Sequence, residues 1–288
     1  MTPSIPTTTV VTGHPARLGV STISFRHRPL REALRLISAT GAWEIDLGAI
    51  PAVTEHVPVP FDGDPGEYAG LLREAGLTCG AVNADPGDLN DPGLTGDELF
   101  STVDPLAELA AALGAALIVP AGRADDVPFV DHEADLTRIA GNLQLISRVC
   151  AARGVRLLVE VLHHRRYVHT VAVADDLLTR CDPDSFGVLF DVSHVVASAE
   201  DPIAWARRLG DRIERVHLRD AVPGNLNLSL GAGEVDLAGV LATLESQGFT
   251  GTYVLELETH DVAEADREAD VARSLALVGS HLGAAATA

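Results

Sequence analysis

Short apolar runs alternate with longer amphipathic stretches along most of this sequence. The runs have the composition of strands that are buried on both faces of a parallel sheet. The stretches between them repeat apolar residues at helical spacing, as Leu30, Ala33, Leu34 and Ile37 do. The predicted strands are residues 17–21, 43–47, 77–83, 116–120, 155–161, 187–191, 213–218 and 252–257. The predicted helices are residues 29–40, 67–75, 98–113, 131–153, 170–181, 202–209, 237–247 and 262–283.

The order of these elements predicts the fold class. Regular alternation of strand and helix favours a parallel α/β sheet, and eight repeats predict a single (β/α)8 TIM barrel over residues 17–288. A doubly wound open sheet is the alternative, but no Gly-x-Gly-x-x-Gly motif follows the first predicted strand. Residues 1–16 are rich in Thr and Pro, have no periodicity, and are predicted to form a flexible leader.

The charge balance excludes several classes of function. The 288 residues carry 41 acidic and 21 basic side chains, a formal net charge of −20. Such a surface repels phosphate backbones, so we expect no nucleic-acid partner. All the basic charge is Arg, and the chain has no Lys. Schiff-base aldolase chemistry, pyridoxal phosphate anchoring and the phosphate-binding P-loop all need a lysine amine and are therefore excluded.

The remaining composition predicts a soluble cytoplasmic protein. The cysteines Cys79, Cys150 and Cys181 are isolated, as is usual for buried thiols in a reducing compartment. No apolar run approaches the roughly 18 residues of a membrane span. The amino terminus also lacks the basic start and apolar core of a secretion signal. We therefore expect no membrane association.

Ionisable residues stand at the ends of the last four predicted strands. They are Glu160, Asp191, His217 and Glu256, each within or at the end of an apolar run, where an unpaired carboxylate costs several kcal/mol. A TIM barrel brings the carboxyl ends of its strands to one face. Three carboxylates and one imidazole suit one divalent cation, Mn²⁺ above all, with Mg²⁺, Co²⁺ or Zn²⁺ as alternatives. Helix caps or ion pairs are the other interpretation of these four residues.

The ordered set of motifs resembles the xylose-isomerase-like TIM-barrel superfamily, which includes sugar and sugar-phosphate isomerases and epimerases, inosose dehydratases and endonuclease IV. The resemblance covers nearly the whole chain from about residue 17. Arg219 stands where the family usually has the Lys of a His-x-Lys-Asp motif. The motifs that carry it are Glu160, Asp191-x-x-His194, His217-Leu-Arg219-Asp220, Gly231-x-Gly233 and Glu256.

The resemblance implies both a ligand set and a reaction. Glu160, Asp191, His217 and Glu256 are expected to bind one divalent metal, and His194 to point at a substrate oxygen. The metal then stabilises an enediolate formed when a proton leaves the carbon beside a carbonyl. Glu160 and Glu256 are the expected acid–base catalysts, one removing and one returning the proton. The first hypothesis is thus a metal-dependent isomerase or epimerase of a sugar, polyol or related hydroxy-ketone.

Two further groups are candidates for contact with substrate. The loop that begins at His163 and ends at Tyr167 follows Glu160, and its polar side chains suit substrate hydroxyls or an anionic group. A solvated polar loop is the alternative. Arg219 is expected either to bind substrate or to join ion pairs around the site.

Several other functions are alternatives to the isomerase. A lyase of the same superfamily, a dehydratase or a C-glycoside-cleaving enzyme, shares the proton removal and stays open. Endonuclease IV-like repair is disfavoured by the charge and because the loop before Gly231 reads Asn225-Leu-Asn227. A standard ketose 3-epimerase is disfavoured by Pro223, where that group has an arginine. A non-catalytic binding barrel predicts broken ligands, whereas all four are present. Pairing of the barrel with itself or with a second subunit stays open.

Overall fold

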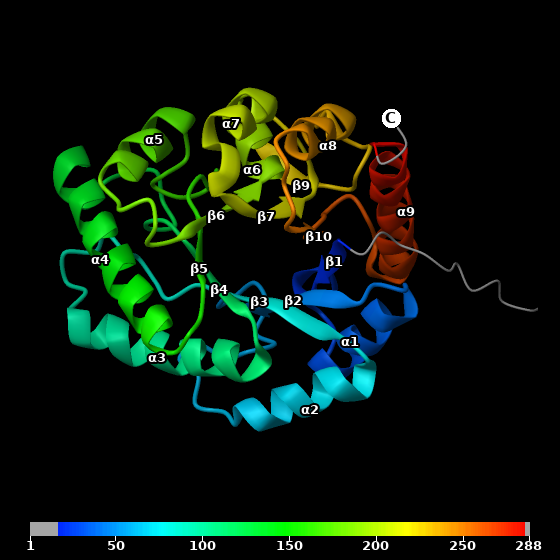
Figure 1. The fold of residues 1–288 in the computed structure, drawn as a ribbon, viewed down its shortest axis with the longest axis horizontal. Coiled ribbons are helices and arrows are strands. Elements are labelled where there is room, and N and C mark those ends of the chain that lie inside the picture. Colours follow the sequence, from blue (N-terminus) through cyan, green and yellow to red (C-terminus); the bar gives the residue numbers. More distant parts are fainter. Residues whose placement is uncertain (1–16, 286–288) are drawn as a thin grey trace, which may run out of the picture.

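Eight parallel strands form a closed barrel in the computed structural model, which describes residues 17–285. Their order around the barrel is β1-β2-β3-β4-β5-β6-β7-β10 (Figure 1). They are β1 (Leu18–Ser21), β2 (Glu44–Ala49), β3 (Thr78–Ala84), β4 (Ala116–Pro120), β5 (Leu157–Glu160), β6 (Gly187–Asp191), β7 (Ile213–Leu218) and β10 (Thr252–Leu255). The predicted TIM barrel is confirmed, and the leader predicted for residues 1–16 lies outside the described residues.

Helices form the outer layer around these strands (Figure 1). They are α1 (Leu30–Ala39), α2 (Pro65–Ala75), α3 (Gly96–Leu113), α4 (His132–Ala152), α5 (Val171–Thr179), α7 (Pro202–Leu209), α8 (Leu237–Ser246) and α9 (Arg267–Ala285). Their starts follow local chemistry: the Asp64 carboxylate caps α2, and Thr95 and Glu98 form a capping box on α3. The left-handed glycines Gly76 and Gly114 end the same two helices.

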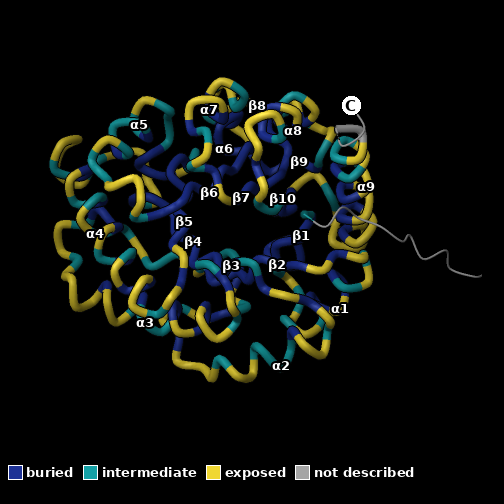
Figure 2. The backbone as a smooth tube through the Cα atoms, in the orientation of Figure 1, coloured by how far each residue is buried: buried dark blue, intermediate teal, exposed yellow. Residues whose placement is uncertain are grey.

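Strand residues alternate between two apolar environments. Residues that face outward pack against the helices in one large core, and Figure 2 shows buried backbone concentrated at the strands. Residues that face inward form a small separate cluster of Ala81, Ile118, Leu158 and Leu189. Because side chains two residues apart share a face of a strand, this phase also directs the polar residues at the strand ends into the barrel.

The structure contains a short helix and a hairpin that the sequence pattern did not predict. Helix α6 (Val192–Ala197) is buried along its whole length, so no polar face produces a helical period. Strands β8 (Asp220–Val222) and β9 (Asn225–Leu228) form an antiparallel pair outside the barrel. The last helix begins at Arg267 and not at residue 262, after the short 3-10 helix Glu264–Asp266.

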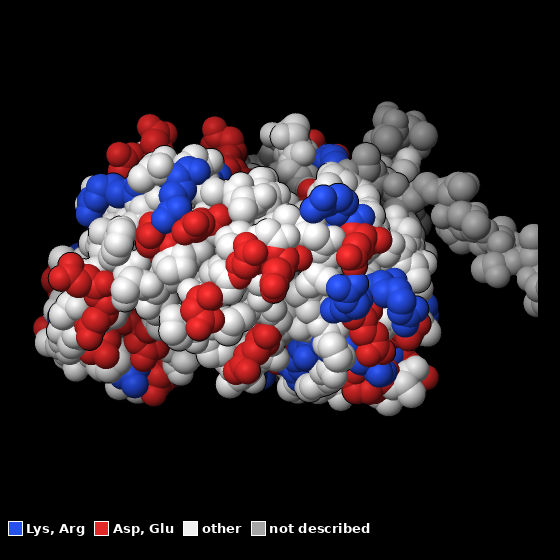
Figure 3. Space-filling view, turned by 90° about the horizontal axis from the view of Figure 1, so that it is seen from below, with Lys and Arg blue, Asp and Glu red and all other residues white. Residues whose placement is uncertain are grey.

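Acidic and basic side chains are interspersed on the face shown in Figure 3, where no continuous basic surface is seen.

Among residues 17–285, no helix combines the length and the apolar character needed to cross a lipid bilayer.

The Asp220 carboxylate holds together the chain that follows β7. It accepts backbone hydrogen bonds from Ala221 (2.9 Å), Gly231 (2.7 Å) and Val235 (3.0 Å). Gly233 packs so closely that a Cβ atom there would overlap the Asp220 carboxylate and the Ala221 carbonyl oxygen. Gly233 is therefore a packing requirement of this loop, whereas Gly231 has open space around its Cβ position and adopts a left-handed φ of 88°.

We expect Gly233→Ala to lower the free energy of unfolding by about 1–3 kcal/mol, because the methyl group overpacks this contact. Urea denaturation measures the change. Gly141→Ala is the matched control, since Gly141 lies in α4 with open space around its Cβ position. It should stabilise the protein by about 0.5–1 kcal/mol. Equal effects of the two substitutions would contradict the proposed packing role.

Candidate metal and substrate site

Asp191 uses its two carboxylate oxygens differently. Its Oδ1 caps α6, accepting hydrogen bonds from the Ser193 backbone N–H (2.7 Å), the Ser193 hydroxyl (2.6 Å) and the His194 backbone N–H (3.3 Å). Its Oδ2 is buried without a hydrogen-bond partner. The cap fixes the orientation of the carboxylate and leaves one oxygen free for a cation. A buried unpaired oxygen of this kind is costly unless another group binds it.

His217 lies on β7 with its two ring nitrogens in different surroundings. Its Nε2 lies 2.8 Å from Asp46 Oδ2, and its Nδ1 lies 3.3 Å from Glu256 Oε1 but makes no hydrogen bond. Burial by itself lowers the pKa of His217, but the carboxylates of Glu256 and Asp46 raise it well above its ordinary value. Histidine ligands of metals usually donate their second N–H to a carboxylate, the arrangement that Asp46 provides.

Asp46 belongs to an ionic layer inside the barrel. Arg215, two residues before His217 on β7, lies 2.6 Å from Asp46 Oδ1 and 2.8 Å from Glu44 Oε1. Burial tends to raise the pKa of Asp46, yet the positive charge of Arg215 and the hydrogen bond from His217 lower it. Asp46 is therefore an ionised acceptor for the Nε2 proton of His217.

Glu256 follows β10 and is also held by neighbours. Its Oε1 accepts a hydrogen bond of 3.0 Å from the side-chain amide of Asn83 at the end of β3. The same oxygen faces His217 Nδ1. One oxygen of Glu256 thus has a fixed position beside His217.

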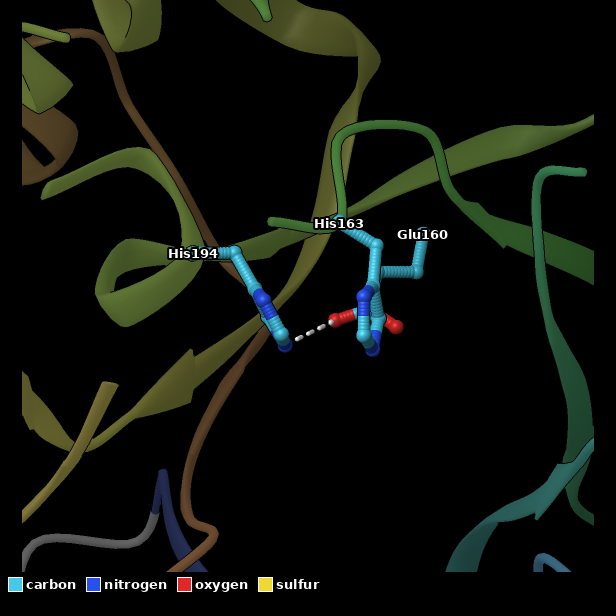
Figure 4. Close-up of side chains that lie close together, drawn as sticks. All are labelled: Glu160, His163 and His194. Carbon is cyan, nitrogen blue, oxygen red and sulfur yellow. Dashed lines mark ion pairs between the residues drawn. The ribbon is translucent and has the colours of Figure 1, made fainter. Parts of the chain in front are cut away.

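The structure divides the predicted site residues into two adjoining groups. Ligand atoms of Asp191, His217 and Glu256 lie within 4.8 Å of one another, and all three residues are buried. Glu160, on β5, lies instead with His163 and His194 (Figure 4). The ligand atoms of these three residues also lie within 4.8 Å of one another. His194 Nε2 connects the groups, because it lies 3.4 Å from Glu160 Oε1 and 3.8 Å from Asp191 Oδ2.

In the second group, burial shifts the pKa of the Glu160 carboxyl group and the pKa values of the two imidazoles in opposite directions. It raises the pKa of Glu160 well above its usual value, and the negative charges of Asp191 and Glu256 add to this effect. It lowers the pKa of His163 and His194 well below the ordinary value for imidazole. The two rings are therefore neutral near pH 7, and Glu160 has an increased affinity for a proton.

Arg219 is almost fully buried beside the ligands. Its Nε donates to the Ser193 hydroxyl (3.2 Å), and its terminal nitrogens lie 3.6 Å from Asp191 Oδ2 and 3.6 Å from Glu258 Oε2. The predicted proximity of Arg219 to the site agrees with these contacts, and its binding of substrate stays a prediction.

Three further residues shape this site, although none of them is among the predicted site residues: Asp46, Asn83 and Ser193. Asp46 and Asn83 do have a signal in the sequence, because each is a polar residue near the end of an apolar strand. Their partners lie on β7 and β10, and nothing in the chain order indicates those pairs.

The first group fits a divalent cation. Asp191 Oδ2 and His217 Nδ1 are buried polar atoms without hydrogen-bond partners, and Glu256 lies beside them. Carboxylate oxygens and one imidazole nitrogen are the donors that Mn²⁺, Co²⁺ and Zn²⁺ accept.

Comparison with known proteins identifies related sequences. The family model described as "Xylose isomerase-like TIM barrel" matches residues 35–280. An inosose dehydratase of Lacticaseibacillus casei is 30% identical over 162 residues, which cover 49% of this chain and 53% of the relative. A 3-dehydroshikimate dehydratase of Pseudomonas putida is 25% identical over 244 residues, which cover 79% of this chain and 38% of the relative. The chain thus spans about half, or less, of the length of these relatives.

A solved structure shares the barrel. It is that of an IOLI protein with a binding zinc atom, which superposes with a TM-score of 0.75 at 18% identity and covers 92% of this chain and 98% of the other. At this identity the likeness shows a common fold.

We expect Asp46→Asn to weaken divalent-metal affinity about 10- to 100-fold, because a neutral amide makes His217 a poorer ligand. Competition with a fluorescent chelator measures the affinity for Zn²⁺ or Mn²⁺.

Glu44→Gln is the matched control for this prediction. Glu44 belongs to the same ionic layer and contacts Arg215, but it has no hydrogen bond to His217 among the described residues. Metal affinity should stay near that of the unmodified chain. If both substitutions weaken binding equally, the ionic layer acts only through general stability.

Proposed function

The chain belongs to the xylose isomerase-like TIM barrel family, and from its site we propose a divalent-metal-dependent enzyme that removes a proton beside a ketone of a sugar or cyclitol. The observation that carries the proposal is the buried group of Asp191, His217 and Glu256, two of which have unpaired ligand atoms. An enzyme of this kind needs a cation for substrate oxygens and a base close by. Glu160 is the nearest candidate base.

Four residues would hold the ion. Asp191, His217 and Glu256 supply the first group, and Glu160 would add a fourth ligand from the adjoining group. When bound, the ion would stabilise the negative charge that develops on the substrate oxygen as the proton leaves. Three carboxylates and one imidazole favour Mn²⁺, and the zinc of the IOLI structure supports a metal of the transition series or Zn²⁺.

Glu160 and Glu256 are not equivalent as bases. Glu256 Oε1 is held by Asn83 and faces His217, whereas Glu160 has a raised pKa and lies 3.4 Å from the ring of His194. A raised pKa brings a carboxylate closer to the optimum of a general base near neutral pH. We therefore assign proton removal to Glu160.

Elimination of water is the first of two outcomes for the deprotonated substrate. The names of the curated relatives, inosose dehydratase and 3-dehydroshikimate dehydratase, support it. A single dominant base also suits elimination, since the proton that Glu160 removes can pass to the departing hydroxide, which leaves as water, and no second group has to return a proton to carbon. Isomerisation or epimerisation, which the sequence favoured, is the second outcome, and the presence of a second carboxylate, Glu256, on another strand supports it.

The buried arginines favour an uncharged substrate. Arg166 pairs with Asp85, and Arg219 lies between Asp191 and Glu258. These guanidinium groups are already neutralised by protein carboxylates. A keto-cyclitol or keto-sugar therefore fits better than a substrate with its own carboxylate.

The purified chain should bind about one divalent ion. Asp191→Asn, Glu256→Gln and Glu160→Gln should each weaken binding by at least about tenfold, since even indirect changes around metal ligands have effects of this size. Elemental analysis after equilibration with Mn²⁺, Co²⁺ or Zn²⁺ measures the ion content.

Glu258→Gln is the matched control, because Glu258 follows the same strand but its carboxylate pairs with Arg26 and Arg219. It should retain the ion. A chain that binds none of these metals would overturn the proposal, and a Glu160→Gln variant with full affinity would remove Glu160 from the ligand set.

Activity should appear as loss of water from an uncharged keto-cyclitol in the metal-loaded enzyme. The assay incubates inososes, ketoses, keto-glycosides and 3-dehydroshikimate in D₂O and follows products by NMR. Glu160→Gln at saturating metal should lower kcat about 10²- to 10⁴-fold, as expected for loss of a general base. Deuterium uptake beside the ketone without loss of water would instead identify an isomerase or epimerase. Faster turnover of 3-dehydroshikimate would contradict the uncharged substrate.

A further inference from the structure

Arg219 follows β7 and lies almost fully buried among the carboxylates of the site. Its terminal nitrogens lie 3.6 Å from Asp191 Oδ2 and 3.6 Å from Glu258 Oε2. These are ion-pair distances and are too long for hydrogen bonds. One of these nitrogens, Nη1, has no hydrogen-bond partner within residues 17–285. The guanidinium therefore brings a positive charge to Asp191 without a hydrogen bond that would occupy Oδ2.

The Ser193 hydroxyl holds the guanidinium in this position. It accepts a hydrogen bond from Arg219 Nε (3.2 Å) and donates one to Asp191 Oδ1 (2.6 Å). Asp191 Oδ1 also caps α6, so the orientation of the carboxylate is fixed at the start of that helix. A short hydrogen-bonded chain thus holds a positive charge beside Asp191 Oδ2, the oxygen that has no hydrogen-bond partner of its own.

The surroundings of Arg219 make this charge effective. A guanidinium group stays protonated in proteins, so its charge is permanent. Only 2% of Arg219 is exposed, and little water is therefore present to screen it. Without a metal ion, the guanidinium offsets part of the cost of burying the Asp191 carboxylate. A divalent ion at Asp191 would instead meet a second positive charge close by.

We propose that Arg219 is a positioning residue of the metal site that lowers its affinity for a divalent ion, because its fixed charge competes with the ion for the charge of Asp191. Its direction is opposite to that of Asp46, which supports a metal ligand and raises affinity. The role rests on the proposed function in so far as Asp191 binds the ion. The contacts of Arg219 do not depend on it.

The test compares Arg219→Gln and Arg219→Lys with the unmodified chain, in competition with a fluorescent chelator for Mn²⁺ and for Zn²⁺. Arg219→Gln removes the charge and keeps a polar side chain, and it should bind both ions about 10- to 100-fold more tightly. Arg219→Lys keeps the charge and should bind both within about threefold of the unmodified chain. Weaker or unchanged binding by Arg219→Gln would overturn the proposal.

The ratio of the two affinities separates an effect of charge from an effect of ligand geometry. Mn²⁺ and Zn²⁺ have the same charge but differ in the ligands and coordination that they prefer. Loss of a positive charge should therefore tighten the binding of both ions about equally. A gain for one ion with a loss for the other would show that the substitution displaced the ligands, and the charge role would be wrong.

Arg26→Gln is the matched control. Arg26 also pairs with Glu258, but it has no ion pair with Asp191 in the described part of the chain. It should bind both ions as the unmodified chain does. Equal tightening by Arg26→Gln and Arg219→Gln would mean that total charge, and not the position of Arg219, sets the affinity, and this would contradict the proposal.

Thermal unfolding with and without Mn²⁺ covers the case in which Arg219→Gln does not fold by itself. Folding that requires Mn²⁺ would support the proposal, because the ion then replaces the charge of the guanidinium. A variant that stays unfolded with Mn²⁺ would overturn it. If neither the unmodified chain nor Arg219→Gln binds an ion, the proposed function fails as well. If the unmodified chain binds and Arg219→Gln binds no more tightly, only the role of Arg219 fails.

Discussion

A buried guanidinium, shared by two carboxylates inside the barrel, is the interaction on which the site depends. Arg215 comes from β7, and Glu44 and Asp46 come from β2, with the two strands β10 and β1 between them in the closed sheet. Burying any one of these charges alone would be strongly unfavourable, but together they compensate one another. Because Arg215 keeps Asp46 ionised, Asp46 can accept the Nε2 proton of His217. The second ring nitrogen of His217, Nδ1, then faces Glu256 Oε1 at 3.3 Å without a hydrogen bond.

Histidines of the same type take different roles through the groups that contact their inner and outer nitrogens. A carboxylate contacts the outer nitrogen of His217, whereas backbone amides contact the inner nitrogens of His163 and His194. The outer nitrogen of His217 is therefore engaged by the protein, whereas in His163 and His194 the inner nitrogens are engaged. Asp191 likewise uses its two oxygens differently. Its Oδ1 caps α6, whereas its Oδ2 has no hydrogen-bond partner. Local hydrogen bonds thus give neighbouring side chains of one site different donor and acceptor atoms.

The fold was predictable to a high degree, and the site to a lesser one. Each of the eight barrel strands overlaps its predicted range, because a strand buried on both faces has an apolar composition that differs from that of an amphipathic helix. Helix α6 has no such contrast, since all its residues are buried. The proposal that Glu160 is a fourth metal ligand remains a prediction. In the structure, Glu160 contacts His194, and it lies with a different group from Asp191, His217 and Glu256.

The sequence by itself determined the barrel and the face on which its chemistry lies. Alternation along each strand sets which residues point inward, and parallel strands carry their last inward residues to one end. Only the tertiary structure decided the partners of those residues. Asp46 and His217 are 171 positions apart, and Asn83 and Glu256 are 173 apart. Periodicity describes one strand at a time, whereas the proton position of a histidine depends on atoms that closure of the barrel brings within 3 Å.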